Sequence, residues 1–131
     1  MEATTREFED EVDDLFAAYA AGFDDFDAEA VADRFAYPCT IWQFGKGNVF
    51  ADREELLENI EALLAVYERE EIVHSAFEIV ETVPAGCVTF VTLDWSQERE
   101  DGEAALAFVC HYALIERADG WKIATVFNED T

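Results

Sequence analysis

The length and charge of this chain exclude several classes of protein. Its 131 residues suffice for one domain around a single core, and a hydrophobic content of 51% argues against disorder. The chain carries 31 Asp and Glu against 8 Lys and Arg, a formal charge of −23. Because nucleic acid and anionic lipid both attract clustered Lys and Arg, we expect neither nucleic acid nor a membrane as a partner.

The same acidic excess indicates the surroundings in which the protein works. Exposed carboxylates repel one another at low salt, but at about 1 M salt the Debye length is only about 3 Å. We therefore infer a salt-rich cytoplasm, as in a halophile, with an ordinary acidic protein as the alternative. The three cysteines include no CxxC pair, and neither a secretory segment nor a membrane span is evident. These features predict a cytoplasmic protein.

The first half of the chain predicts three helices and two short strands. Apolar residues recur at helical spacing from Phe8 to Phe23, and Asp27 can cap a second helix that carries Phe35. The run CTIWQF predicts a strand, and NVF predicts its return after a glycine turn. An acidic capping box, Asp52 and Glu55, precedes a third amphipathic helix that continues to Tyr67.

The second half predicts four long strands. From Glu71 the apolar period changes to two, in the run EIVHSAFEIVETV. Three further runs follow, joined by EDG and ADG turns: CVTFVTLDWSQER, EAALAFVCHYALIER and WKIATVF. Helices gathered before consecutive antiparallel strands predict one α+β domain over residues 1–131, with helices packed on one face of a curved sheet.

Two segments resemble the NTF2-like superfamily, which includes SnoaL-like polyketide cyclases, ketosteroid isomerases and scytalone dehydratase. They are LFAAYAAGFDDFDAEAVADRFAYPCTIW and the closing hairpin ALIERADGWKIATVF. The resemblance implies a cystatin-like α+β cone, in which three N-terminal helices pack on a curved, mainly antiparallel sheet and enclose a pocket. It also implies a homodimer through the convex sheet face, and it specifies fold better than activity.

The strand alternation then predicts which residues face the pocket. In the run EAALAFVCHYALIER, alternate residues form a bulkier set that suits the concave core: Leu106, Phe108, Cys110, Tyr112 and Leu114. The residues between them, which include His111, form a flatter set that suits packing against a partner sheet. In the preceding run, the ketosteroid isomerase pattern places Val88, Phe90, Thr92, Asp94 and Ser96 inward. A β-bulge would reverse this second assignment.

Asp94 and His111 are the catalytic candidates. A carboxylate in an aromatic cavity would have a raised pKa and could transfer protons, although a solvated strand-end Asp94 is the simpler alternative. His111 could act similarly, but a hydrogen-bonded histidine in the dimer-facing row is the alternative. With His111 and His74 far apart, and no HxH, HExxH or CxxC pattern, we expect no metal site. No cofactor motif is present, and we expect no cofactor.

Tyr19, Trp42, Gln43 and Tyr112 are the predicted ligand-binding residues. The resemblance to ketosteroid isomerases places Tyr19 at the oxyanion-hole tyrosine and Gln43 at or next to the catalytic aspartate. Glutamine cannot act as a general base, so steroid isomerisation is disfavoured. Trp42 and Tyr112 fall where the fold would place the cavity wall.

Three hypotheses for function remain open at this point. The first is a protein that binds a small apolar or aromatic molecule in the cavity. The second is a cofactor-independent SnoaL-type isomerase, cyclase or dehydratase that uses Asp94 or His111 for proton transfer. The third is a structural homodimerisation module whose cavity is filled by its own side chains.

Overall fold

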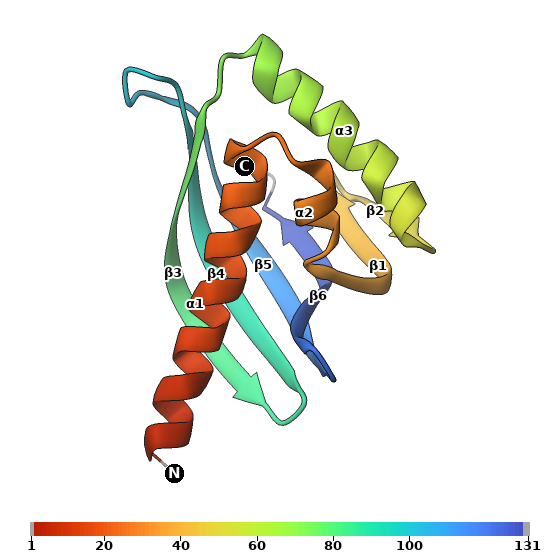
Figure 1. Ribbon diagram of the computed structural model, residues 1–131, viewed down its shortest axis with the longest axis vertical. Coiled ribbons are helices and arrows are strands. Elements are labelled where there is room, and N and C mark those ends of the chain that lie inside the picture. Colours follow the sequence, from red (N-terminus) through yellow and green to blue (C-terminus); the bar gives the residue numbers. More distant parts are fainter. Residues whose placement is uncertain (1, 130–131) are drawn as a thin grey trace.

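The computed structural model describes residues 2–129, with side chains described from Glu9 onward. Within these residues the three helices and six strands follow the predicted order (Figure 1). The elements are α1 (Glu2–Asp24), α2 (Ala28–Ala32), β1 (Phe35–Gln43), β2 (Lys46–Phe50), α3 (Arg53–Arg69), β3 (His74–Ala85), β4 (Val88–Glu98), β5 (Ala104–Arg117) and β6 (Gly120–Asn128). The predicted core position of Phe8 lies outside the described side chains.

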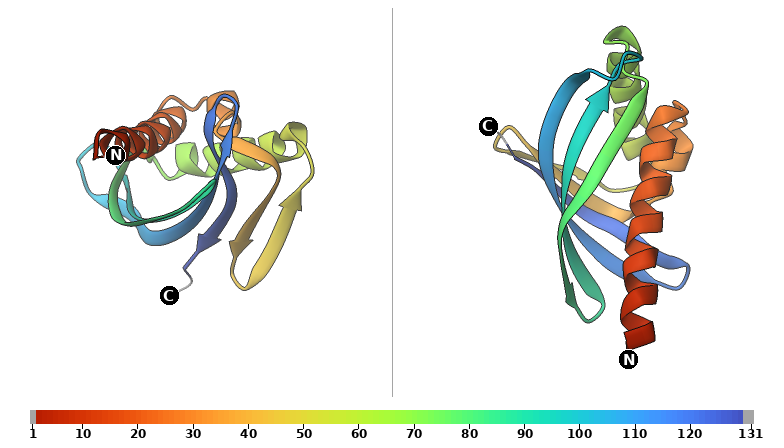
Figure 2. Two further views of the ribbon diagram at one scale, coloured as in Figure 1. Left: turned by 90° about the horizontal axis from the view of Figure 1, so that it is seen from below. Right: turned by 90° about the vertical axis from the view of Figure 1, so that its left-hand side faces the viewer.

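The strands form one sheet in the order β2-β1-β6-β5-β4-β3. Every neighbouring pair is antiparallel except β1 and β6, which run parallel. Figure 2 shows the sheet curling around the helices, which lie on its concave side. The α+β class, with helices on one face of a curved and mainly antiparallel sheet, is confirmed.

Two predicted helix caps are present. Asp27 Oδ1 accepts a hydrogen bond from the Ala30 amide at 3.1 Å, and Asp52 Oδ1 accepts one from the Glu55 amide at 3.0 Å. Glu55 Oε2 reciprocates by accepting from the Ala51 amide at 2.8 Å. These bonds satisfy amides that the first helical turn leaves unpaired, and so fix where α2 and α3 begin.

The predicted end of the second helix is wrong. Phe35 opens β1 rather than closing α2, because it pairs with Ile123 of β6 and is buried in the core. The tertiary pairing of a parallel strand therefore overrides the helical spacing of Val31 and Phe35.

The concave face of the sheet carries the core. The buried face of α1, which includes Val12, Phe16 and Phe23, packs toward it. Tyr19 lies at the centre of an aromatic cluster, where its ring centroid is 5.1 Å from that of Phe23 and 5.9 Å from that of Trp95. The edge-to-face geometry of these rings adds to the stabilisation from burial.

The predicted phase of β5 is confirmed, and the predicted phase of β4 is wrong. In β5, Cys110, Tyr112 and Leu114 are buried, as expected for the concave face. In β4 the buried phase is Val91, Leu93, Trp95 and Gln97, the opposite of the prediction. No bulge causes this, since β4 pairs with β5 without a register shift from Val88 to Gln97. Burying Leu93 and Trp95 removes much apolar surface from water and leaves Asp94 hydrated.

Within the described residues, no helix is both long and apolar enough to cross a membrane.

The exposed carboxylates predict that salt stabilises this fold. Five of them, at positions 9, 10, 11, 13 and 14, lie within about one and a half turns of α1. Raising KCl from about 0.05 M to about 1 M should screen their repulsion and raise the melting temperature by about 4 °C or more. A variant with Asp10→Lys, Asp13→Lys and Asp14→Lys should show a smaller rise, measured by circular dichroism. A melting temperature that is unchanged or falls with salt would contradict the prediction.

Candidate functional site

A cavity of about 550 Å³ lies between α1, α3 and the concave face of the sheet. Its volume falls within the roughly 300–1,000 Å³ range of small-molecule sites. The apolar wall includes one residue from each of α1, α3, β4, β5 and β6: Phe23, Val66, Trp95, Phe108 and Val126. The curvature of the sheet thus leaves room under α3 that the side chains do not fill.

Apolar side chains also surround the opening of the cavity. Phe44, Leu63 and Leu106 line it and are 81%, 37% and 47% exposed. Gln43 and Asn59 contribute exposed amide groups to the same lining. An apolar molecule could therefore enter the cavity past an apolar margin.

Hydrogen bonds between strands organise the inner part of the cavity. Trp95 Nε1 donates to the Tyr112 hydroxyl at 2.8 Å, which joins β4 to β5. Cys110 Sγ donates to Asn128 Oδ1 at 2.7 Å, and Asn128 Nδ2 donates to the Trp42 carbonyl at 3.3 Å, which joins β5, β6 and β1. These bonds hold the cavity wall in one arrangement.

The titratable groups deep in the cavity are uncharged at neutral pH. Burial raises the pKa of Tyr19, Tyr67 and Tyr112 well above the usual tyrosine value. Burial likewise raises the pKa of the Cys110 thiol to about 12. These four side chains are therefore neutral rather than anionic. Among the described lining residues Glu129 is the one carboxylate, and it is exposed.

Gln97 has an unusual position in the cavity wall. Its side chain is 2% exposed, and its carbonyl oxygen Oε1 is buried without a hydrogen-bond partner. Such an atom normally costs about 1–3 kcal/mol of folding free energy when it stays unpaired. Gln97 was not predicted as a site residue, because the opposite face of β4 was expected to point inward. The bulky side chains of Leu93 and Trp95, which share the face of Gln97, are the signal that could have placed it in the cavity.

Three of the four predicted ligand-binding residues line the cavity: Tyr19, Gln43 and Tyr112. The predicted place of Trp42 in the cavity wall is wrong. Its ring stacks on Phe127 on the outer face, with centroids 6.5 Å apart and an interplanar angle of 14°. Consecutive strand residues point to opposite faces, so Trp42 and Gln43 could not both face inward.

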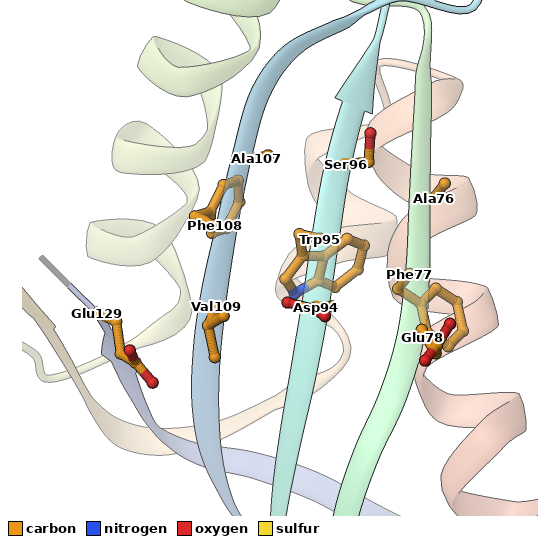
Figure 3. Close-up of a pocket in the computed structure, with 10 residues that line it drawn as sticks. All are labelled: Ala76, Phe77, Glu78, Asp94, Trp95, Ser96, Ala107, Phe108, Val109 and Glu129. Atoms are coloured by element: carbon orange, nitrogen blue, oxygen red, sulfur yellow. The ribbon is translucent and has the colours of Figure 1, made fainter. Parts of the chain in front are cut away.

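Asp94 also lies on the outer face, and its predicted place in the cavity is wrong. It is exposed and pairs across the strands with Glu78 of β3 and Val109 of β5. Asp94 and Glu78 line a shallow depression on the outer face, where Figure 3 shows them on adjacent strands. The next residue, Trp95, is buried in the core instead.

His111 occupies the outer row of β5 and is hydrogen-bonded there, as the alternative to a catalytic role anticipated. Its Nδ1 lies 2.9 Å from Thr92 Oγ1, and its Nε2 contacts the Glu129 carboxylate. Neither Asp94 nor His111 is therefore in position to act on a molecule inside the cavity. In the part of the chain that the structure describes, no group of three or more His, Cys, Asp or Glu side chains could hold a metal ion.

Solved structures with similar folds cover nearly the whole chain. An NTF-2 like protein of unknown function from Shewanella oneidensis is 17% identical, with a TM-score of 0.74 over 93% of this chain and 98% of that one. A candidate dehydratase of the NTF2-like family from Streptomyces avermitilis is 15% identical, with a TM-score of 0.70 over 93% and 94%. At these identities the likeness concerns the fold alone.

The sequence itself places the chain in a family. No curated protein matches it. A family model described as NTF2-like protein (DUF6841), however, matches residues 9–131. This chain therefore belongs to the NTF2-like family DUF6841.

Proposed function

We propose that this protein binds a small apolar molecule in the cavity between its helices and its sheet. The observation that carries the proposal is the open cavity of about 550 Å³, which has an apolar wall and a few polar groups. Sites of this composition usually hold small molecules, with the polar groups orienting the ligand. Tyr19, Gln43 and Tyr112 are the orienting residues that sequence and structure both favour.

The cavity has less to support the enzyme hypothesis. A SnoaL-type isomerase, cyclase or dehydratase was expected to use Asp94 or His111 for proton transfer, and both lie on the opposite face of the sheet. The buried tyrosines and Cys110 have raised pKa values, so they are poor bases at neutral pH. The open cavity also argues against a module whose interior is filled by its own side chains.

Filling the cavity from α3 should abolish ligand binding. Ala62 lines the cavity, whereas Ala65 lies on the same helix at a separate surface depression. With 4-hydroxybiphenyl as test ligand in isothermal titration calorimetry, we expect saturable binding at one site per chain. Ala62→Trp should weaken it by about 10-fold or more, since an overlapping ring would cost at least about 1.4 kcal/mol of binding energy.

Ala65→Trp is the matched control, and it should bind as the unchanged protein does. The proposal is wrong if 4-hydroxybiphenyl does not bind, or if both variants bind it equally well while their circular dichroism shows an intact fold.

We propose further that two copies associate through the outer sheet face. That face carries exposed apolar side chains on several strands: Trp42, Val49, Val83, Phe90 and Phe127, each 43–68% exposed. Pairs such as Trp42 with Phe127 and Phe90 with Val83 lie directly across from one another. Exposed apolar side chains spread over several strands of one face support a self-complementary interface. The acidic surface supports a salt-rich cytoplasm as the setting, with neither nucleic acid nor membrane as partner.

A charge placed on the outer face should separate the two copies. Phe90→Asp introduces a carboxylate on this face, which a closed interface would have to desolvate without a partner. Sedimentation velocity in about 1 M KCl, where repulsion is screened, should show a dimer for the unchanged protein and a monomer for Phe90→Asp. Leu63→Asp on α3, an equally apolar but distant site, should leave the dimer intact. A monomeric unchanged protein would refute the proposed interface.

A further inference from the structure

We propose that the cavity selects an uncharged molecule that carries an O–H or N–H group, and that this group donates a hydrogen bond to Gln97. The inference rests on the proposed function and names the chemistry of its ligand. Two independent features of the described residues carry it: an unpaired oxygen atom on Gln97 in the cavity wall, and a lining without positive charge.

The first feature is the acceptor itself. Gln97 lines the cavity, is 2% exposed, and has no partner for Oε1. A protein interior rarely leaves an amide oxygen unpaired, because burial removes its hydrogen bonds to water. With a small turn of the Gln97 amide toward the cavity, a donor on a ligand would restore the missing bond, so the affinity gained there selects ligands with a donor.

The neighbouring residue on β3, Ser75, lies beside Gln97 but is not part of the cavity lining. Ser75 pairs directly across from Gln97, on the same face of the sheet. It is 3% exposed, and its hydroxyl oxygen also lacks a partner. Facing residues of an antiparallel pair have Cβ atoms about 5 Å apart, so two unsatisfied groups meet here. Because Ser75 does not line the cavity, the acceptor within reach of a ligand is that of Gln97.

Thr89 is an instructive contrast on the same strand. Its hydroxyl is likewise buried and unpaired, at 0% exposure, but Thr89 does not line the cavity. It lies eight residues from Gln97 along β4, roughly 26 Å at the rise of an extended strand. Thr89 therefore provides a buried unpaired oxygen that no cavity ligand can reach.

The second feature excludes anions. The described cavity lining contains no Lys, Arg or His side chain, and its buried tyrosines and thiol are neutral. An anion moved into this site would lose its hydration without gaining a counter-charge, and Glu129 at the exposed margin would repel it. A cation would be equally unpaired in the depth of the cavity.

Four ligands of one shape test both features. Biphenyl has no polar group, 4-methoxybiphenyl has an acceptor only, 4-hydroxybiphenyl has a donor, and biphenyl-4-carboxylate is an anion. At neutral pH and about 1 M KCl, where the charge of the whole protein is screened, we expect 4-hydroxybiphenyl to bind about 10-fold more tightly than the methoxy compound, as one hydrogen bond of ordinary strength predicts. The carboxylate should bind more weakly than biphenyl itself.

Two variants assign the donor preference to its residue. Gln97→Leu should still bind biphenyl and should lose the 10-fold preference for the hydroxyl group, consistent with the loss of one hydrogen bond. Thr89→Val should keep that preference. Both substitutions remove an unpaired buried oxygen, so both should raise the melting temperature of the ligand-free protein. Only the binding measurements separate the two positions.

The outcomes distinguish this inference from the proposed function. If biphenyl binds but the four affinities do not depend on the donor, or if Gln97→Leu retains the preference, the cavity binds ligands without the selectivity proposed here. Tighter binding of 4-methoxybiphenyl than of 4-hydroxybiphenyl would mean that Gln97 presents its amide hydrogens, and it would also overturn the inference. If none of the four ligands binds, the proposed function fails with it.

Discussion

The hydrogen bond from Trp95 Nε1 to the Tyr112 hydroxyl links the neighbouring strands β4 and β5 inside the core. It requires Trp95 of β4 and Tyr112 of β5 to share the concave face, and strand alternation then assigns every other residue of both strands to a face. Gln97 follows Trp95 by two positions and faces the cavity, whereas Asp94 precedes it by one and faces outward. The buried pair of Trp95 and Tyr112 thus determines which residues of β4 and β5 face the cavity.

The same arrangement separates a charged exterior from a neutral interior. The surface holds the carboxylates that give the chain its charge of −23, while the inner part of the cavity holds tyrosines, a thiol and amides. The tyrosines and the thiol remain protonated because burial raises their pKa. Hydrogen bonding and shape, rather than ion pairing, are the means by which such an interior can discriminate among ligands.

Periodicity and turn chemistry predicted most of the fold. The apolar stripe of α1 and the capping box of α3 depend on neighbouring residues alone, and both appear as predicted. The phase of β5 was also predictable, because the side chains in one phase are much bulkier than in the other. Phe35 was misplaced because its strand pairs in parallel with β6, a contact distant in sequence.

The site was predicted less well, for physical reasons that concern particular residues. Both faces of β4 carry apolar side chains, and its inward face was predicted from a remote resemblance to ketosteroid isomerases, which placed Asp94 rather than Trp95 inside. The outward direction of Trp42 follows from its stacking on Phe127. The unpaired state of Gln97 is a property of the assembled core, since no local pattern shows which buried oxygen will lack a partner.

The side-chain amide of Gln97 offers the most direct measurement. In a titration with 4-hydroxybiphenyl followed by nitrogen-15 NMR, we expect its two amide proton signals to shift saturably, with the same dissociation constant as calorimetry gives. Backbone signals of outer-face residues such as Asp94 and Val109 should move little. Binding that shifts the outer-face signals and leaves the Gln97 amide unchanged would contradict a ligand site inside the cone.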